Sequence, residues 1–218
     1  MRILQTIKLA ALALLIGVGF SVKEARAAES ESIVVAGGCF WCVEADFERV
    51  RGVRDAVSGY TGGTVEDPTY KQVTGGDTGH YEAVKITFDP ATISRKQILD
   101  MFFRSIDPTD AGGQFCDRGD SYRTAIFVSD SAEREVAQAA KQRAEAELGQ
   151  TIVTPILEAA PFYEAEDYHQ DYYKGTKLVL TRFGPKRQAE AYKRYRDACG
   201  RDERVRQLWG DAAPFAGS

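Results

Sequence analysis

The chain has 218 residues, of which 44% are hydrophobic and 28% are charged, and this composition fits one ordinary globular domain. Seven prolines and twenty glycines exclude collagen-like and proline-rich classes, and four cysteines are too few for a disulfide-dense miniprotein. The formal net charge of −4 argues against nucleic acid as a partner, because phosphate binding requires a cationic surface.

The first 27 residues are predicted to be a secretory signal peptide. Arg2 and Lys8 provide a positive start, residues 9–20 form an uncharged and mostly aliphatic run, and small residues precede a cleavage site near Ala27. The apolar run is shorter than the roughly 20 residues that span a bilayer. The alternative is an uncleaved anchor at the membrane surface. We therefore expect export, with a periplasmic location.

The mature domain is expected to comprise residues 28–218. Cleavage removes four basic residues and one acidic residue, which takes the net charge from −4 to −7. An exported protein meets an oxidising compartment in which disulfides persist. Because no later stretch is long and apolar enough to cross a bilayer, we expect no stable membrane insertion after cleavage. We also expect the protein to be a monomer.

The mature sequence predicts strands and helices in an irregular order. Short runs of β-branched and aromatic residues indicate strands, and apolar residues three or four apart indicate helices. The predicted strands are residues 33–36, 53–60, 83–88, 124–128 and 152–157, and the predicted helices are residues 40–50, 94–103, 130–148, 166–173 and 188–199. Because the order lacks βαβ regularity, we expect a single α+β domain, a two-layer sandwich of a mixed or antiparallel sheet with helices packed on it.

Local signals indicate several boundaries. A capping-box pattern begins at Ser94, and Asp130 is a suitable first residue for the helix that follows it. Pro155 indicates that its strand lies at an edge or contains a bulge. The segment that holds Pro68 and Gly75-Gly76 is predicted to be a loop. Residues 107–120 lack periodicity and are predicted to be a long loop.

The most informative stretch is residues 37–44, Gly-Gly-Cys-Phe-Trp-Cys-Val-Glu. Cys39 falls where a strand turns into a helix, and the glycines before it let the backbone turn sharply and leave the sulfur accessible. Unpaired N–H groups and the helix dipole favour a thiolate at such a position. We therefore expect a nucleophilic Cys39 with a pKa below the usual value of about 8.5. Phe40 and Trp41 would offer a substrate an apolar wall.

The Cys39–Cys42 pair has other interpretations. The two residues could form a permanent disulfide, or both could simply be buried. A zinc site is disfavoured, because the chain has no second CxxC, and neither His80 nor His169 belongs to a close pair of ligands. We expect both histidines to form structural hydrogen bonds.

Several later runs accompany this segment in a fixed order. They are Gly59-Tyr60-Thr61-Gly62-Gly63, Pro68-Thr69-Tyr70, residues 76–84, Asp107-Pro108, residues 117–126 and residues 165–170. In order and spacing they resemble the peptide methionine sulfoxide reductase A family, over about residues 33–173. A lone CxxC is weak evidence, whereas an ordered set of motifs is strong evidence.

The resemblance implies thiol-dependent reduction of methionine sulfoxide, free or in proteins, with a preference for the S epimer. By similarity, Cys39 attacks the sulfoxide sulfur and Glu82 protonates the oxygen, which is otherwise a poor leaving group. Glu82 must then be protonated, as a carboxyl group in an apolar pocket tends to be. Tyr70 and Tyr122 would hydrogen-bond the oxygen, and Asp117 would order the surrounding network.

The resemblance also implies how the substrate is held and how the enzyme is regenerated. Phe40 and Trp41 would hold the S-methyl group. Cys39 would become a sulfenic acid, which a second thiol condenses into a disulfide. A thioredoxin-like partner would reduce that disulfide, and no metal or organic cofactor is implied.

The cysteines depart from the family pattern. Many members have glycine at the position of Cys42 and another residue at the position of Cys116, and they often keep a resolving cysteine in a C-terminal tail. Here the tail candidate is Cys199. Cys42 could resolve the sulfenic acid locally, Cys199 could swing in, or Cys199 could form a structural disulfide with Cys116.

Two other functions fit parts of the sequence. A thioredoxin-like disulfide oxidoreductase could use Cys39 and Cys42, but no cis-proline is clearly marked. A disulfide-stabilised binding domain would leave Glu82, Tyr70 and Tyr122 without roles. A methionine sulfoxide reductase accounts for more of the sequence.

Overall fold

The computed structural model describes residues 30–181 and 184–217. The predicted signal peptide, residues 1–27, lies outside the described residues. Within the described ranges, no helix combines the length and the apolar character needed to cross a membrane.

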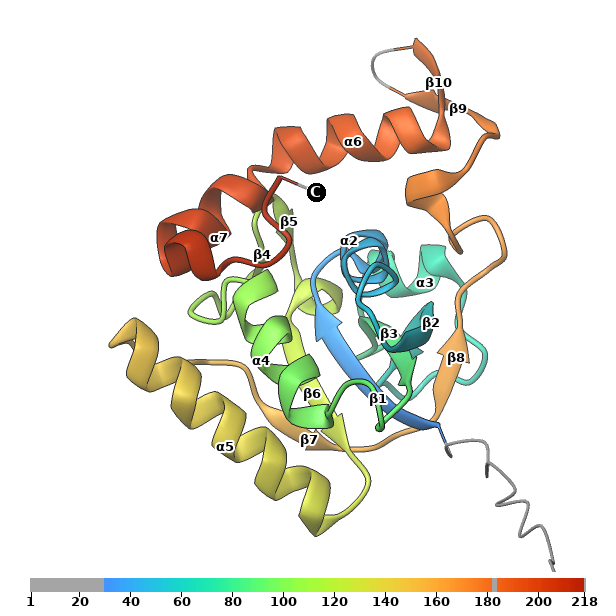
Figure 1. Cartoon of the computed structure of the whole chain (residues 1–218). Coiled ribbons are helices and arrows are strands. Elements are labelled where there is room, and N and C mark those ends of the chain that lie inside the picture. Colours follow the sequence, from blue (N-terminus) through green and yellow to red (C-terminus); the bar gives the residue numbers. More distant parts are fainter. Residues whose placement is uncertain (1–29, 182–183, 218) are drawn as a thin grey trace, which may run out of the picture.

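A six-stranded mixed sheet lies at the centre of the fold (Figure 1). Its strand order is β7-β6-β1-β3-β2-β8, and every neighbouring pair is antiparallel except β6 with β7. The strands are β1 (Glu31–Gly37), β2 (Val53–Thr61), β3 (Tyr81–Phe88), β6 (Thr124–Val128), β7 (Ile156–Glu158) and β8 (Phe162–Glu164). Two small hairpins pair β4 (Gly113–Gln114) with β5 (Asp117–Arg118), and β9 (Leu178–Thr181) with β10 (Gly184–Arg187).

The helices cover this sheet and extend beyond it. The α-helices are α2 (Phe40–Phe47), α3 (Tyr70–Gly75), α4 (Arg95–Ser105), α5 (Ser131–Leu148), α6 (Gln188–Cys199) and α7 (Arg201–Trp209). The 3-10 turns are η1 (Asp120–Tyr122), η2 (Tyr172–Lys174) and η3 (Gly210–Ala212). In Figure 1, α6 crosses the top of the molecule and continues into α7, while α4 and α5 lie lower, beside the sheet. The expected α+β domain with helices on a mixed sheet is confirmed.

Alternate residues of β3 point to the same side of the sheet, and the apolar ones show which side carries the main core. Val84, Ile86 and Phe88 are buried in the same cluster as Phe102 and Phe103 of α4. Each such side chain contributes roughly 1.5–3 kcal/mol when it is fully buried. β3 pairs with β1 over Val84–Phe88, and its first residues pair with β2, where Glu82 lies opposite Tyr60. These first residues reach the functional site.

Local capping signals act as predicted. The Ser94 side chain accepts a hydrogen bond from the N–H of Gln97 at the start of α4, and Asp130 accepts one from the N–H of Glu133 at the start of α5. β7 lies at the edge of the sheet directly after Pro155, as the proline indicated.

Two predictions were wrong in extent or type. Residues 166–173 form turns and part of η2 rather than a helix, and Asp171 has a φ of +56°, which interrupts a right-handed helix. The strand predicted at residues 152–157 begins only at Ile156. In both segments the backbone is shaped by contacts with distant elements, which a local pattern does not record.

Other elements were not predicted. The loop around Pro68 contains α3, whose first residues form a capping box between Thr69 and Gln72, so a local signal was present. β8, the β9–β10 hairpin and α7 were also missed. β8 and α7 have few apolar residues in periodic positions, whereas β9 is a short run of apolar and β-branched residues that indicated a strand. The predicted loop 107–120 contains the short strands β4 and β5.

Gly38 makes the turn from β1 into α2, and we predict that Gly38→Ala destabilises the protein. Gly38 has a φ of +79°, and an added Cβ would lie 2.5 Å from Cβ of Gln114. The left-handed backbone alone costs roughly 1–2 kcal/mol for a non-glycine residue, and the clash adds to this cost. Urea unfolding measures the change in the free energy of unfolding. Gly75→Ala is the matched control, because no atom lies within 4 Å of its added Cβ. Equal stability of the two variants would contradict the prediction.

Candidate active site

Cys39 is the N-cap residue of α2, directly after the turn at the end of β1. Its side chain is almost fully buried, with 6% of its surface exposed. The predicted position at a strand-to-helix turn is therefore confirmed, but the expected open access to the sulfur is not, because other elements cover it.

Glu82, on β3, lies beside the start of α2. Its Oε2 accepts a hydrogen bond from the backbone N–H of Phe40 at 3.1 Å, so the carboxyl group is tied to the residue after Cys39. Its Oε1 is buried and has no hydrogen-bond partner among the described residues. One carboxyl oxygen is thus fixed, and the other is available to a ligand.

Cys39 and Glu82 line one small cavity of about 50 Å³. It collects side chains from α2, α3, β3, β5, η1 and α6, which lie far apart in the sequence. The lining residues are Cys39, Phe40, Trp41, Tyr70, Glu82, Asp117, Tyr122 and Tyr195. The fold therefore brings together every predicted catalytic and substrate-binding residue, and it adds Tyr195.

Burial controls the protonation of Glu82. It raises the pKa of this carboxyl group to about 8, and the hydrogen bond from Phe40 opposes that rise only in part. The negative charge of nearby Asp117 raises the pKa further. Glu82 is therefore protonated at neutral pH, as the acid role requires.

The expectation of a lowered pKa for Cys39 was wrong. Burial raises the pKa of its thiol well above the usual value, and hydrogen bonding to Cys42 and the charges of Cys42, Glu82 and Asp117 raise it further. The helix dipole acts only as a partial charge at the end of an eight-residue helix, and it does not outweigh this desolvation. Cys39 rests as a neutral thiol.

Cys42 is a second buried free thiol, and it contacts Cys39 one helical turn away. The Cys39 thiol donates a hydrogen bond to the Cys42 sulfur, and this bond lowers the pKa of Cys42. The positive charges of Arg201 and Arg196 lower it further. The two cysteines are thus adjacent but not joined, so the interpretation as a permanent disulfide is not supported.

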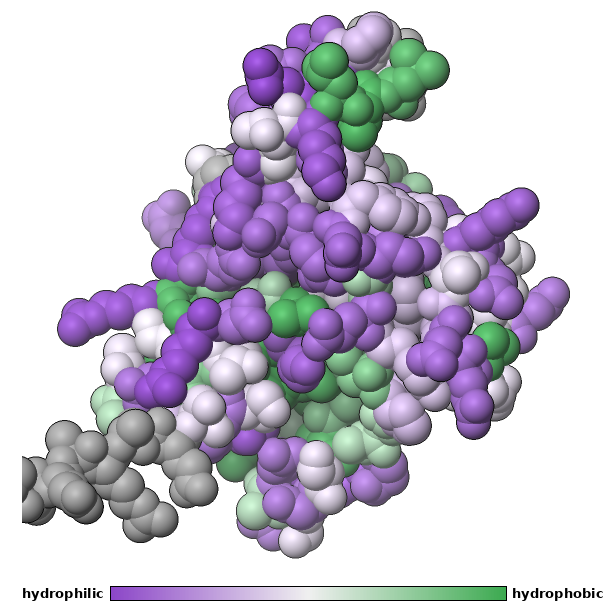
Figure 2. Space-filling view, turned by 90° about the vertical axis from the view of Figure 1, so that its right-hand side faces the viewer, coloured by the Kyte–Doolittle hydropathy of each residue, from purple (hydrophilic) through white to green (hydrophobic). Residues whose placement is uncertain are grey.

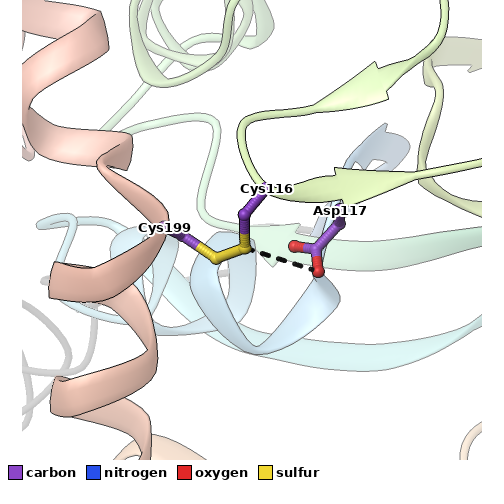
Figure 3. Close-up of side chains that lie close together, drawn as sticks. All are labelled: Cys116, Asp117 and Cys199. Carbon is purple, nitrogen blue, oxygen red and sulfur yellow. Dashed lines mark hydrogen bonds between the residues drawn. A yellow bond between two sulfur atoms is a disulfide. The ribbon is translucent and has the colours of Figure 1, made fainter.

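Cys116 and Cys199 form a disulfide across the site's outer edge (Figure 3). It joins the β4–β5 hairpin to the end of α6, and Cys116 is exposed. This is the structural disulfide considered from the sequence. Because Cys199 is bonded to Cys116, it has no free thiol with which to resolve a sulfenic acid. Asp117 follows Cys116 directly, and its Oδ1 lies 3.9 Å from the Cys116 sulfur (Figure 3).

Tyr195 is the site residue that the sequence analysis missed. It lies on α6, one helical turn before Cys199, and its hydroxyl donates a hydrogen bond to Oδ2 of Asp117. The disulfide and this hydrogen bond therefore join the same two segments. A Tyr four residues before a Cys on a polar helix gave no motif from which to predict the contact.

Trp41, in the aromatic wall of the cavity, is held in place by Tyr172 and His169. Trp41 stacks on Tyr172 with ring centroids 3.9 Å apart, and its Nε1–H donates to Nδ1 of His169 at 3.2 Å. Burial lowers the pKa of His169 to about 4, so the ring is a neutral acceptor at neutral pH. His80 accepts from the N–H of Gly63 and contacts the carbonyl oxygen of Val65. Both histidines form structural hydrogen bonds, as expected.

Two buried or partly buried glutamates anchor the surrounding segments. Glu44, on α2, accepts hydrogen bonds from the Ser58 hydroxyl and from the N–H of Asp171. Glu166 accepts from the Tyr60 hydroxyl and from the N–H of Tyr70, each at 3.0 Å. Both residues belong to motifs quoted above, but the sequence assigned them no role.

Comparison with known proteins decides the family. A family model described as peptide methionine sulfoxide reductase matches residues 31–211. The chain belongs to this family. The match extends past residue 173, where the quoted motifs end, and so it includes α6 and α7.

Relatives of similar length support this assignment. Peptide methionine sulfoxide reductase MsrA 2 of Rhizobium meliloti (strain 1021) is 48% identical over 198 residues, which cover 91% of this chain and 92% of the relative. The protein of the same name from Caulobacter vibrioides is 46% identical over 211 residues, which cover 96% of this chain and 100% of the relative.

Solved structures of the family share the fold. Reduced Mxr1 from Saccharomyces cerevisiae has a TM-score of 0.63 at 30% identity, covering 68% of this chain and 86% of that protein. Methionine sulfoxide reductase A of Corynebacterium diphtheriae has a TM-score of 0.60 at 29% identity, covering 66% and 74%.

In this peptide methionine sulfoxide reductase, we predict that removing the exposed disulfide lowers stability. The crosslink spans 83 residues of sequence. In the chain-entropy model, a loop of this size is worth about 4.5 kcal/mol, because the crosslink restricts the unfolded chain. Thermal and urea unfolding of Cys116→Ser/Cys199→Ser should show this loss under non-reducing conditions. Adding a reductant should bring the wild type close to the double variant. An unchanged midpoint in the double variant would contradict the prediction.

Proposed function

We propose that the protein reduces the S epimer of methionine sulfoxide, free or in proteins, to methionine. One observation carries this proposal: a single small cavity places the Cys39 thiol, the protonated Glu82 carboxyl group and the side chains of Tyr70 and Tyr122 around the same space. A nucleophile, a proton donor and two hydroxyl groups are the parts that sulfoxide reduction needs.

In the proposed chemical step, the Cys39 sulfur attacks the sulfoxide sulfur while Glu82 transfers its proton to the sulfoxide oxygen. The proton of the Cys39 thiol returns the carboxylate to its acid form. The attack forms a transient bond between the two sulfur atoms. This bond and the sulfur–oxygen bond then break as the hydroxyl group moves to the Cys39 sulfur, which leaves a sulfenic acid on Cys39 and releases methionine. The methionine sulfur gains two electrons, and Cys39 loses two.

The tyrosines and the aromatic wall orient the substrate. Burial raises the pKa values of Tyr70 and Tyr122, so both phenols stay protonated and can donate hydrogen bonds to the sulfoxide oxygen. Phe40 and Trp41 line the cavity on the apolar side and can hold the S-methyl group. Asp117 accepts from Tyr195 and orders the outer edge.

For regeneration, we propose that Cys42 condenses with the Cys39 sulfenic acid to form a disulfide and release water. Cys42 contacts Cys39 one turn along α2, and the positive charges of Arg201 and Arg196 favour its nucleophilic thiolate. Cys199, the other candidate, is held in the disulfide with Cys116. A thioredoxin-like dithiol protein then reduces the Cys39–Cys42 disulfide and becomes oxidised itself.

We place this activity outside the cytoplasm, in the periplasm, after cleavage of the signal peptide. The features of residues 1–27 and the exposed disulfide, which persists best in an oxidising compartment, support this location. We also propose that the protein acts as a monomer.

We predict that the rate constant of the first turnover falls as the pH rises through about 8. Glu82 is protonated below its raised pKa and loses its proton above it, so the acid form is lost as the pH increases. Glu82→Gln should slow the step by about 10²–10⁴-fold and remove this decline, because an amide cannot transfer the proton. Quenched-flow measurement with N-acetylmethionine sulfoxide checks both results.

Cys39→Ser is the control for this prediction and should be inactive at every pH. Turnover that survives Cys39→Ser would remove the proposed reaction. A wild-type rate in Glu82→Gln would remove Glu82 from the acid role.

A second prediction concerns the resolving cysteine. After one turnover without reductant, Cys42→Ser should retain a sulfenic acid on Cys39, because no thiol in contact can condense with it. A dimedone adduct detected by mass spectrometry reports this species. Cys199→Ser is the matched variant and should still form the Cys39–Cys42 disulfide. Trapping of the sulfenic acid in Cys199→Ser alone would assign resolution to Cys199 instead.

A further inference from the structure

A second hollow lies next to the catalytic cavity and has no role in the chemistry above. This groove has a volume of about 390 Å³, within the range of pockets that bind small ligands or side chains. Its walls are mostly apolar: the aromatic rings of Trp41, Tyr172 and Tyr195, small side chains of α6 including Ala198, and the Cys116–Cys199 disulfide.

The groove and the catalytic cavity share two walls. Trp41 and Tyr195 line both spaces, so the groove begins where the cavity ends. The cavity, at about 50 Å³, has room for the sulfoxide end of one side chain and not for the neighbouring residues of a peptide. Those residues must therefore lie outside it, and the groove is directly adjacent.

The shared walls are held in place before any ligand binds. Trp41 is stacked on Tyr172 and hydrogen-bonded to His169, while Tyr195 is bonded to Asp117. The disulfide at Cys199 fixes the same helix one turn further along. A preformed apolar surface binds an apolar side chain with little ordering cost.

We propose that this groove binds a large apolar or aromatic residue adjacent to the methionine sulfoxide of a peptide substrate. The proposal rests on the reductase function and extends it, because it makes the protein selective for methionine sulfoxide in apolar sequence contexts. The continuity of the groove with the catalytic cavity through Trp41 and Tyr195 identifies the occupant as part of the substrate.

The experiment compares peptides in a first turnover without reductant, so that the Cys116–Cys199 disulfide stays intact. The probes are blocked tripeptides with methionine sulfoxide in the centre and Phe or Gly on either side, with N-acetylmethionine sulfoxide as the reference. Partial burial of a phenyl ring should raise the second-order rate constant about tenfold over the all-glycine peptide, for at least one placement of Phe. Ala198→Trp should fill the groove and reduce this ratio to about one.

Ala146→Trp is the matched control, since Ala146 is exposed on α5, away from the groove, and it should keep the tenfold ratio. Ala191→Trp, also in the groove, should lower the ratio and serves if Ala198→Trp fails to fold. Thiol titration of each variant should show two free thiols, which confirms that the disulfide has formed.

Three outcomes would overturn the proposal. The first two are a ratio near one in the wild type and a ratio that persists in both groove variants. The third is seen in a separate assay with thioredoxin as the reductant, where groove variants that slow only the reduction by thioredoxin would assign the groove to the reductant. Turnover of N-acetylmethionine sulfoxide separates these results from failure of the reductase function. If the wild type does not reduce it, the proposed function itself is wrong.

Discussion

The site depends on one buried hydrogen bond, from the backbone N–H of Phe40 to Oε2 of Glu82. The first N–H groups of a helix have no partner within the helix, so α2 needs an acceptor from elsewhere. β3 supplies that acceptor, and the same carboxyl group is the acid in the proposed mechanism, beside Cys39. Oε2 is bonded to the helix, whereas Oε1 has no hydrogen-bond partner among the described residues. Oε1 is therefore available to a ligand in the cavity that Glu82 lines. A single contact thus joins the helix to the sheet and sets the catalytic geometry.

Burial keeps the two reacting groups uncharged at rest. It raises the pKa values of both Cys39 and Glu82, and a charge on Glu82 would raise the pKa of Cys39 further. A neutral pair suits a neutral substrate such as a sulfoxide, because both protons are present when the substrate enters. Activation of the nucleophile is then coupled to proton transfer within the cavity, and it does not depend on a preformed thiolate.

The C-terminal helices enclose the site and separate the cysteines into two pairs. Arg196 of α6 forms a buried ion pair with Asp46 of α2 at 2.8 Å, and Arg201 of α7 donates to the carbonyl oxygen of Gly37 at 3.2 Å. These contacts bring positive charge to the inner pair, where it lowers the pKa of Cys42. The outer pair, Cys116 and Cys199, fixes α6 against the β4–β5 hairpin.

The β9–β10 hairpin projects beyond α6, and its exposed apolar side chains form the patch at the top of Figure 2.

The sequence by itself determined most of the strands and helices of the central sheet region and the position of the nucleophile segment. The glycines before Cys39, the capping residues Ser94 and Asp130 and the alternation on β3 act through neighbours in the chain, so they could be predicted. The ordered motifs also identified Glu82, Tyr70, Tyr122 and Asp117 by resemblance, and the fold places all four at one cavity.

Only the tertiary structure decided the protonation of Cys39, the pairing of Cys116 with Cys199, the contact of Tyr195 with Asp117 and the irregular path of residues 166–173. Each depends on residues that are distant in the chain. A pKa follows from how deeply other elements bury the group, and a disulfide follows from which loop meets which helix. These are properties of the assembled core, and no local pattern of residues encodes them.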